Sequence, residues 1–162
     1  MRTAPLKRDQ ITEWQRLRAL LWPDLPAAQH RREMVDILSD LEFNAVFVAV
    51  GRDRKLHGFL EASIRMTAEG CLPGPIGYIE AWFVEPRHRR KGVGAGLMKK
   101  AEAWATSRGC KDMASDAEIE NEGGRQAHQS LGYQEVARLA HFRKSLRERE
   151  AVRQPAARLG PD

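Results

Sequence analysis

Apolar residues recur every three or four positions in the first quarter of the chain, a spacing that predicts amphipathic helices. The segment 8–23, "RDQITEWQRLRALLWP", has Asp9 at a capping position and Pro23 at its end. Its apolar face holds Trp14, Leu17 and Leu21. A second helix is predicted over 27–43, with an apolar stripe of Met34, Ile37, Leu38 and Leu41. Both helices therefore have a face that can pack on a sheet.

The pattern then changes to β-rich runs. Strands are predicted over 44–50, 56–65 and 76–86, and Pro86 closes the third. The linker "GRDRK" between the first two is a hairpin signal, and the Gly/Pro-rich "EGCLPGP" forms a loop before the third. A further strand is expected ahead of the two helices, so the sheet has at least four strands.

Helical spacing returns at Val93 and ends at Gly109, where a C-terminal cap belongs. One face of this helix collects Val93, Leu97, Ala101, Trp104 and Ala105. A short strand over 110–116, a helix over 121–132 and an alternating final strand over 134–146 complete the pattern. This order predicts one α/β domain over residues 1–146, with a mixed sheet covered by helices. Residues 147–162 form a charged, Ala/Pro-rich tail.

Length and composition agree with a single domain, because 162 residues with 42% hydrophobic side chains can build one core. No window approaches the roughly 18 unbroken apolar residues of a membrane span, and the N-terminus lacks a secretory signal. We therefore expect a cytoplasmic protein. Cys71 and Cys110 are isolated and the five histidines are scattered, so we expect free thiols and no metal site.

The net charge of +5 and a pI near 9.6 would by themselves suggest nucleic acid as a partner. The distribution argues against it. Residues 87–100 contain six basic side chains, whereas residues 112–122 contain five acids and no base. A protein that only binds phosphate gains nothing from such an acidic run. One that holds an anionic cofactor beside a cationic substrate needs both signs, so no nucleic-acid partner is expected.

The basic segment coincides with a glycine-rich turn before a helix. Gly92, Gly94 and Gly96 lie between the predicted strand and helix, where glycine lets a ligand approach the backbone. The free N–H groups of the helix and its dipole favour an anion such as pyrophosphate. The turn lacks the Lys-Ser/Thr of a P-loop, and Leu97 stands where a dinucleotide fingerprint needs glycine. A plain turn with a solvated basic face is the alternative, but the coincidence of so many features favours a ligand site.

These residues carry a resemblance to a known family. The segment "RRKGVG" is similar to the Arg-x-x-Gly-x-Gly acetyl-CoA motif of the GNAT N-acetyltransferase superfamily, at Arg89, Gly92 and Gly94. Further segments resemble bacterial aminoglycoside 6'-N-acetyltransferases, which confer antibiotic resistance, in the same order along residues 21–144. They are "LWPD", "LEASIR", "GYIEAWFVEPRHRRKGVGAGLMKKAEAWA", "ASDAEIEN" and "HQSLGYQE".

The resemblance implies a GNAT fold of the α/β (α+β) class, with a mixed, mostly antiparallel central sheet flanked by helices. It also implies acetyl-CoA as donor, no metal cofactor and, commonly, a homodimer. By position, the pantetheine arm would follow the backbone of Trp82, Phe83 and Val84. The pyrophosphate would be bound around Arg89, Arg90, Lys91, Gly92, Val93, Gly94 and Ala95. Asn121 would contact the arm further on.

On the acceptor side, the resemblance implies that Glu80 contacts the aminoglycoside amine and is the candidate general base. Asp116 corresponds to a second substrate-binding acid, Trp22 to a wall of the pocket, and Glu135 to a possible sugar contact. The structural alternatives are a surface ion pair for Glu80, capping for Asp116 and a core position for Trp22. Acids in the pocket would attract a polyammonium substrate.

The remaining chemistry leaves alternatives open. His128 and Tyr133 are the candidates for the acid that protonates the departing thiolate, and His128 could instead be a packing residue. No base is placed beside either cysteine in the sequence, so direct attack on the thioester is favoured over an acetyl-cysteine route. The acceptor could be another amine, such as a polyamine or a protein N-terminus. A basic nucleic-acid-binding module is the distant alternative.

Overall fold

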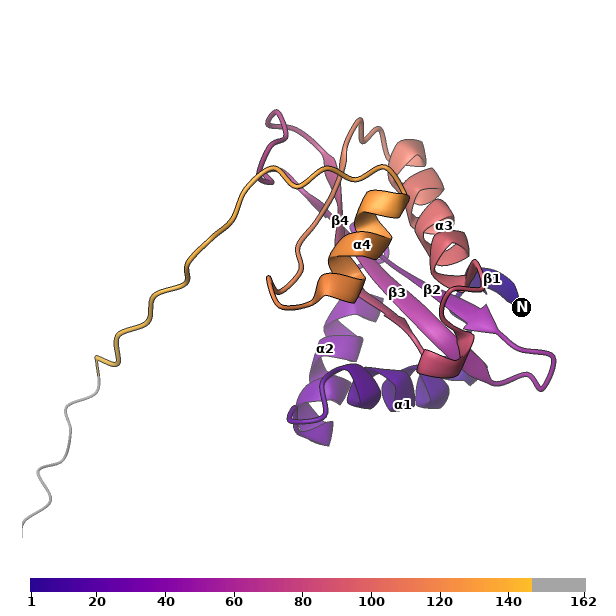
Figure 1. Cartoon of the computed structure of the whole chain (residues 1–162). Helices are drawn as coiled ribbons and strands as arrows, with labels where there is room; N and C mark the ends of the chain where they lie inside the picture. Colours follow the sequence, from indigo (N-terminus) through magenta and orange to yellow (C-terminus); the bar gives the residue numbers. More distant parts are fainter. Residues whose placement is uncertain (147–162) are drawn as a thin grey trace, which may run out of the picture.

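Five strands form one sheet in the order β1-β2-β3-β4-β5 in the computed structural model, which describes residues 1–146 (Figure 1). The strands are β1 (Arg2–Pro5), β2 (Asn44–Val50), β3 (Leu56–Arg65), β4 (Ile76–Val84) and β5 (Met113–Ser115). The first four pair antiparallel, and β5 pairs parallel to β4. The predicted mixed, mostly antiparallel sheet is confirmed.

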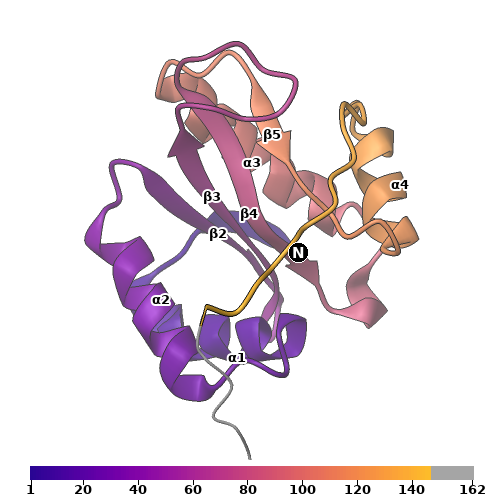
Figure 2. The ribbon, with the colours of Figure 1, turned by 90° about the vertical axis from the view of Figure 1, so that its left-hand side faces the viewer.

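Helices cover both faces of this sheet (Figure 2). On one face lie α1 (Ile11–Leu21), which follows the 3-10 turn η1 (Arg8–Gln10), and α2 (Ala27–Ser39). They enclose a core with Trp14 and Leu17 against Val48, Leu56 and Phe59. The opposite face holds α3 (Val93–Ser107), whose Leu97, Met98 and Ala101 pack on Phe47 and Leu60. The short 3-10 turn η2 (Pro86–His88) lies between β4 and α3 along the chain. The last helix, α4 (Glu122–Ser130), follows β5. None of the helices described is long and apolar enough to cross a membrane.

Two local expectations were wrong. Asp9 does not cap the first helix, because η1 precedes it and Gln10 occupies the N-cap position, where its side chain accepts from the Lys7 N–H. Leu41 is not on the stripe of α2, because that helix ends at Ser39 and leaves Leu41 exposed.

The prediction of a final strand over 134–146 was also wrong. These residues form no strand, and no described strand pairs with them. Alternation shows which side chains would share a face, but a strand also needs a neighbour to satisfy its backbone hydrogen bonds. Four apolar side chains are consequently exposed: Val136, Leu139, Phe142 and Leu146. The predicted tail, 147–162, lies outside the described residues.

Candidate active site

Glu80 is placed by an irregularity in the pairing of β3 with β4. Glu61 pairs with Ala81 and Ala62 with Ile79, so Glu80 is an extra residue on β4. Such a bulge redirects a side chain relative to a regular strand. The Glu80 carboxylate accepts from Arg65 Nε at 2.9 Å and Arg65 Nη2 at 2.6 Å, and from the Ser63 hydroxyl. The ion pair that was the structural alternative for Glu80 is present, and it holds the carboxylate of the candidate base in one orientation.

Glu80 lines a shallow groove of about 330 Å³ between the sheet and the first two helices. The residues around the groove are Arg18, Trp22, Glu33, Asp36, Ile37, Asn44, Glu61 and Glu80. The structure therefore brings Trp22 and Glu80 together, as the resemblance implied. Four of the lining residues are acids, which makes the groove suited to an amine that carries several positive charges.

Three of these acids, Glu33, Asp36 and Glu61, were missed by the sequence analysis. Glu33 and Asp36 lie three positions apart on α2 and therefore share one helix face. Glu61 interrupts an otherwise apolar strand segment, which is the signal that could have identified it. No acid of the run 112–122 lines this groove.

Glu61 is a buried carboxylate whose contacts connect the groove to α1. Its Oε1 accepts from Trp14 Nε1 at 2.8 Å, and both its oxygens lie 2.8 Å from Arg18 Nη1. Arg18 Nη2 also pairs with Glu33, so one guanidinium serves two acids. Burial raises the pKa of Glu61 to about 7, although the Arg18 charge opposes the shift.

Asp116 follows β5 and acts on the partners of Glu80. Burial and then the charge of Asp116 raise the pKa of Tyr78. The Arg65 guanidinium lies over the Tyr78 ring, 3.4 Å from its centroid. Burial alone would lower the pKa of Arg65, but the hydrogen bond and charge of Glu80 raise it, with a contribution from Asp116. Asp116 therefore belongs to the electrostatic environment of Glu80.

Glu135 is placed elsewhere. Its carboxylate accepts from Arg125 Nη2 at 2.9 Å and from Arg138 Nε. Hydrogen bonds from Arg138 and Arg125 lower the pKa of Glu135. It is not among the residues that line the groove, so the structure does not bring it together with Trp22 and Glu80.

The second half of β4 has an open edge. Pairing with β5 ends at Ile79 and Ser115, while β4 continues to Val84. Within the described residues no strand occupies this edge beyond Ile79. Backbone groups of Trp82, Phe83 and Val84 are therefore positioned as the edge of a sheet that can receive an extended, amide-bearing ligand.

The bend after β4 leads directly into the first turn of α3. Gly92 is the N-cap of α3 with φ 75°, and no side chain caps the helix there. The N–H groups of Val93, Gly94 and Ala95 have no acceptor within the helix, because they belong to its first turn. Gly94 packs so closely on Trp82 that a Cβ would lie 2.8 Å from the indole. This geometry gives the bend the free amides that the predicted anion site requires.

His128 and Tyr133, the two candidate acids, have different surroundings. His128 Nδ1 lies 2.8 Å from the Gly124 carbonyl, so Nδ1 donates, and Nε2 lies 3.0 Å from the Ser115 hydroxyl. The edge of its ring meets Trp82, with centroids 5.1 Å apart. The Tyr133 hydroxyl donates to Glu102 Oε1 on α3 at 3.0 Å. Burial, together with the charge of Glu102 and this hydrogen bond, raises the pKa of Tyr133.

Asn121, predicted to touch the coenzyme arm, begins α4. Its Oδ1 accepts from the Gly124 N–H at 2.9 Å, which makes it the N-cap of that helix. The same Gly124 gives its carbonyl to His128. Asn121 therefore supports the turn of α4 that holds His128 in place.

Comparisons with known proteins agree with this arrangement. The model of the acetyltransferase (GNAT) family matches residues 14–133. A curated relative from Klebsiella aerogenes, aminoglycoside N(6')-acetyltransferase type 1, is 40% identical. The match covers 88% of this chain and 95% of the relative. A relative of the same name from Acinetobacter baumannii is 33% identical, with 99% of it and 90% of this chain covered.

Solved structures give the same result. The enzyme AAC(6')-Iy, in complex with the bisubstrate analogue CoA-S-monomethyl-acetylneamine, superposes with a TM-score of 0.83 at 34% identity. That match covers 89% of this chain and 97% of the solved chain. The aminoglycoside 6'-N-acetyltransferase AAC(6')-IG from Acinetobacter haemolyticus gives a TM-score of 0.82, also at 34% identity, over 91% and 100% of the two chains.

Proposed function

The chain belongs to the acetyltransferase (GNAT) family, and from this premise we propose that it transfers the acetyl group of acetyl-CoA to the 6'-amine of aminoglycosides. One observation carries the proposal: β4 ends at a bend with free backbone amides and has a groove lined by four acids beside its middle. A diphosphate-bearing donor and a polyammonium acceptor therefore meet along one strand. The relatives named above support the choice of substrate.

On the donor side, the backbone around Trp82, Phe83 and Val84 receives the pantetheine arm, and the amides of the bend receive the pyrophosphate. Arg89, Arg90 and Lys91 add positive charge at the same place. Arg89 Nε donates to the Val84 carbonyl at 2.8 Å, which ties the bend to the end of β4. The thioester is thereby held beside the middle of the strand, where Glu80 lies.

On the acceptor side, Glu33, Asp36 and Glu80 bind ammonium groups, and Trp22 forms an apolar wall. Glu80 takes a proton from the attacking ammonium group, directly or through water, so that the nitrogen has a free electron pair. The amine nitrogen then bonds to the thioester carbon and releases its second proton to solvent, and the C–S bond breaks as coenzyme A leaves. A main-chain N–H near Phe83 is the candidate donor to the developing oxyanion.

The departing thiolate needs a proton, and the surroundings favour His128 over Tyr133 as its source. His128 lies against Trp82 on the strand assigned to the coenzyme, whereas the Tyr133 hydroxyl is directed to Glu102 on α3. We expect His128→Asn to lower kcat about 100-fold, and Tyr133→Phe to lower it much less. Steady-state kinetics that gave the reverse order would assign the acid to Tyr133.

Direct transfer is supported by the state of the two cysteines, both of which are free. Burial and the charge of Asp112 raise the pKa of the Cys71 thiol, and burial raises that of Cys110. Both are therefore thiols at neutral pH, without the activation that a covalent intermediate requires. Free thiols also agree with a cytoplasmic location, which forms part of the proposal.

The exposed apolar side chains of residues 134–146 support a homodimer, in which a second copy supplies the partner that this segment lacks. Val136, Leu139, Phe142 and Leu146 would lose their exposed apolar surface in such a contact. We expect Phe142→Asp to convert a dimer into a monomer in light scattering, and Val35→Asp on the exposed face of α2 to leave the dimer intact. The opposite pattern would move the contact to α2.

A turnover assay tests the proposed reaction. Release of coenzyme A is measured with kanamycin, tobramycin, spermidine and a peptide with a free N-terminus, and the acetylated product is mapped by NMR. We expect turnover with the aminoglycosides and a new acetamide at the 6' position. Preferential turnover of spermidine or the peptide would transfer the function to another amine, and an acetyl group at a different amine would remove the 6' assignment.

A further inference from the structure

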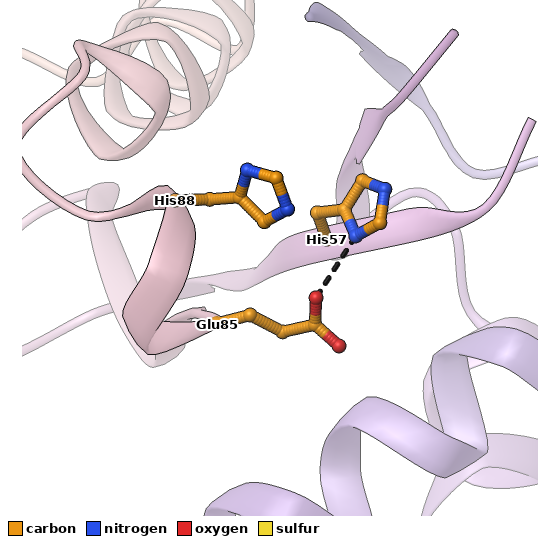
Figure 3. A group of neighbouring side chains, drawn as sticks. All are labelled: His57, Glu85 and His88. Atoms are coloured by element: carbon orange, nitrogen blue, oxygen red, sulfur yellow. Dashed lines mark hydrogen bonds and ion pairs between the residues drawn. The ribbon is translucent and has the colours of Figure 1, made fainter. Parts of the chain in front are cut away.

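A second group of titratable side chains lies apart from the acidic groove, at the far end of β4. His57 near the start of β3, Glu85 after the end of β4 and His88 in η2 point toward one another (Figure 3). One nitrogen or oxygen from each lies within 4.8 Å of the others. His57 and Glu85 are buried and His88 is half-buried. The proposed reaction gives none of these side chains a role.

Each ring nitrogen of His57 faces a carboxylate, and a neutral imidazole can donate to only one of them. Nδ1 lies 2.9 Å from Glu85 Oε2, and Nε2 lies 3.1 Å from Asp53 Oδ1. Both partners are carboxylates, which only accept when ionised. A neutral imidazole has one N–H, so one of the two contacts would place two lone pairs against each other. Either a second proton or a metal ion must occupy that contact.

His88 decides between these two solutions. Its Nε2 is buried and has no hydrogen-bond partner among the described residues. A nitrogen of this ring faces His57, and the two ring centroids are 4.3 Å apart (Figure 3). A second proton on His57 would leave this nitrogen unsatisfied, whereas a cation that accepts electron pairs satisfies His88, His57 and Glu85 together. We propose that His57, Glu85 and His88 form a binding site for a divalent transition-metal ion, with Zn²⁺ the best match.

The ligand types favour Zn²⁺ over Mg²⁺ or Ca²⁺, because two imidazoles and one carboxylate suit zinc, whereas the harder ions prefer oxygen. Ligand atoms about 2.1 Å from a tetrahedral zinc lie roughly 3.4 Å apart. The cluster therefore closes by small side-chain rotations, and a water completes the coordination.

Glu85 supplies the one carboxylate among the three ligands. Arg16 contacts only Oε1, at 2.9 Å, and so leaves Oε2 for the metal. Arg87 contacts Oε2 at 3.3 Å with a side chain that is 69% exposed, so it can move into solvent.

The charges around the site favour a cation. Arg16 is paired with Glu13 at 3.1 Å as well as with Glu85. Three carboxylates, Glu13, Asp53 and Glu85, face the two guanidiniums of Arg16 and Arg87, which leaves one net negative charge at the site. Asp53 accepts from Nε2–H of His57 and so directs the Nδ1 lone pair toward the metal, as carboxylates behind zinc-bound histidines do.

No local sequence pattern shows this site, because its residues are not contiguous. Glu85 and His88 form a Glu-x-x-His pair, but His57 lies 28 positions before Glu85. The antiparallel pairing of β3 with β4 brings them together, since Gly58 pairs with Val84. The site lies where β4 leads into the bend that carries the coenzyme amides, and a bound ion would link that bend to β3.

Metal titration of the untagged, chelator-treated full chain tests the proposal. Zn²⁺ is titrated calorimetrically and Co²⁺ spectroscopically, because Co²⁺ bound by imidazole nitrogen in a four-coordinate site gives strong visible bands. We expect one ion per chain, a rise in Tm with Zn²⁺ and no response to Mg²⁺. His88→Ala should weaken Zn²⁺ binding at least 10-fold and abolish the bands, and Asp53→Asn should weaken binding about 10-fold.

His141→Ala, which removes an exposed histidine elsewhere, is the matched control and should bind as the parent does. If His57→Gln fails to fold, His88→Ala still decides, because His88 is half-buried in a short turn. Equal Zn²⁺ affinity in His88→Ala and the parent, loss of binding in His141→Ala, or no binding to the parent would each overturn the proposal.

Discussion

The two sides of β4 are assembled in different ways. The coenzyme side takes its backbone from residues 82–95, a single run of strand, bend and helix. The acceptor groove collects residues from α1, α2, β2, β3 and β4, and its acids lie between positions 33 and 80. The first side is a local structure that binds mainly through backbone groups. The second depends on tertiary packing and binds through side chains.

This difference implies different sensitivities. A backbone site is damaged only by changes that alter the course of the chain, whereas a side-chain site loses its function with single functional groups. Substitutions on one side should therefore change binding of one substrate and leave binding of the other intact.

Removal of the carboxylate at Glu80 should have the largest effect. For Glu80→Gln we expect kcat/KM for an aminoglycoside to fall by about 10²- to 10⁴-fold, because the amine loses its base. The affinity for coenzyme A, measured by calorimetry, should stay unchanged. Glu118→Gln, an exposed acid outside the groove, is the control and should retain activity. Undiminished kcat/KM in Glu80→Gln would exclude Glu80 from the chemistry.

Substitution at the bend should affect the coenzyme instead. Gly92→Val puts a β-branched residue at φ 75°, and Gly94→Val drives a side chain into Trp82. Each should weaken coenzyme A binding by about 100-fold, roughly the loss of one charge-assisted hydrogen bond. Gly123→Ala on α4, where a Cβ meets nothing, serves as control. Normal affinity in both valine variants would show that the pyrophosphate binds away from the bend.

The buried acid of the groove should make stability depend on pH. The folded pKa of Glu61 is raised to about 7, above its ordinary value of 4.5. Between these values the folded chain keeps a proton that the unfolded chain releases, so the free energy of unfolding falls as pH rises through this window. In Glu61→Gln this contribution should disappear. Denaturant titrations from pH 4 to 8 measure it, and parallel profiles for parent and variant would contradict the assignment.

The smallest effect is expected at the partner of Glu80. The Arg65–Glu80 pair is about 40% exposed, with side-chain values of 43% and 35%, so Arg65→Met should cost less than about 1 kcal/mol of stability. Because Arg65 holds both oxygens of the base, kcat should still fall about 10-fold while coenzyme affinity is kept. A large drop in Tm, or an unchanged kcat, would show that the pair does not orient the base.

The same contrast explains which parts of the site could be predicted from sequence. Strand, terminal proline, glycine turn and helix follow one another at residues 84–97, so local rules suffice to place the bend. Glu33 and Glu61 are 28 positions apart along the sequence, and only the packing of α1 against both α2 and β3 brings them to the guanidinium of Arg18. Even Glu80, expected from the resemblance, owes its direction to a bulge that no local pattern shows.

The last predicted strand shows a further limit. Residues 134–146 alternate as a strand does, yet pairing depends on an available edge, which composition does not reveal. The helix boundaries were missed by a few residues at 8–10 and 40–43, where competing turns decide the ends.

A crystal structure of the chain with coenzyme A and kanamycin tests the account most directly. We predict the diphosphate on the N–H groups of Val93, Gly94 and Ala95, the pantetheine arm along Trp82 to Val84, and the 6'-amine next to Glu80. Coenzyme bound away from the bend, or an aminoglycoside bound outside the groove of Trp22, Glu33 and Glu80, would contradict it.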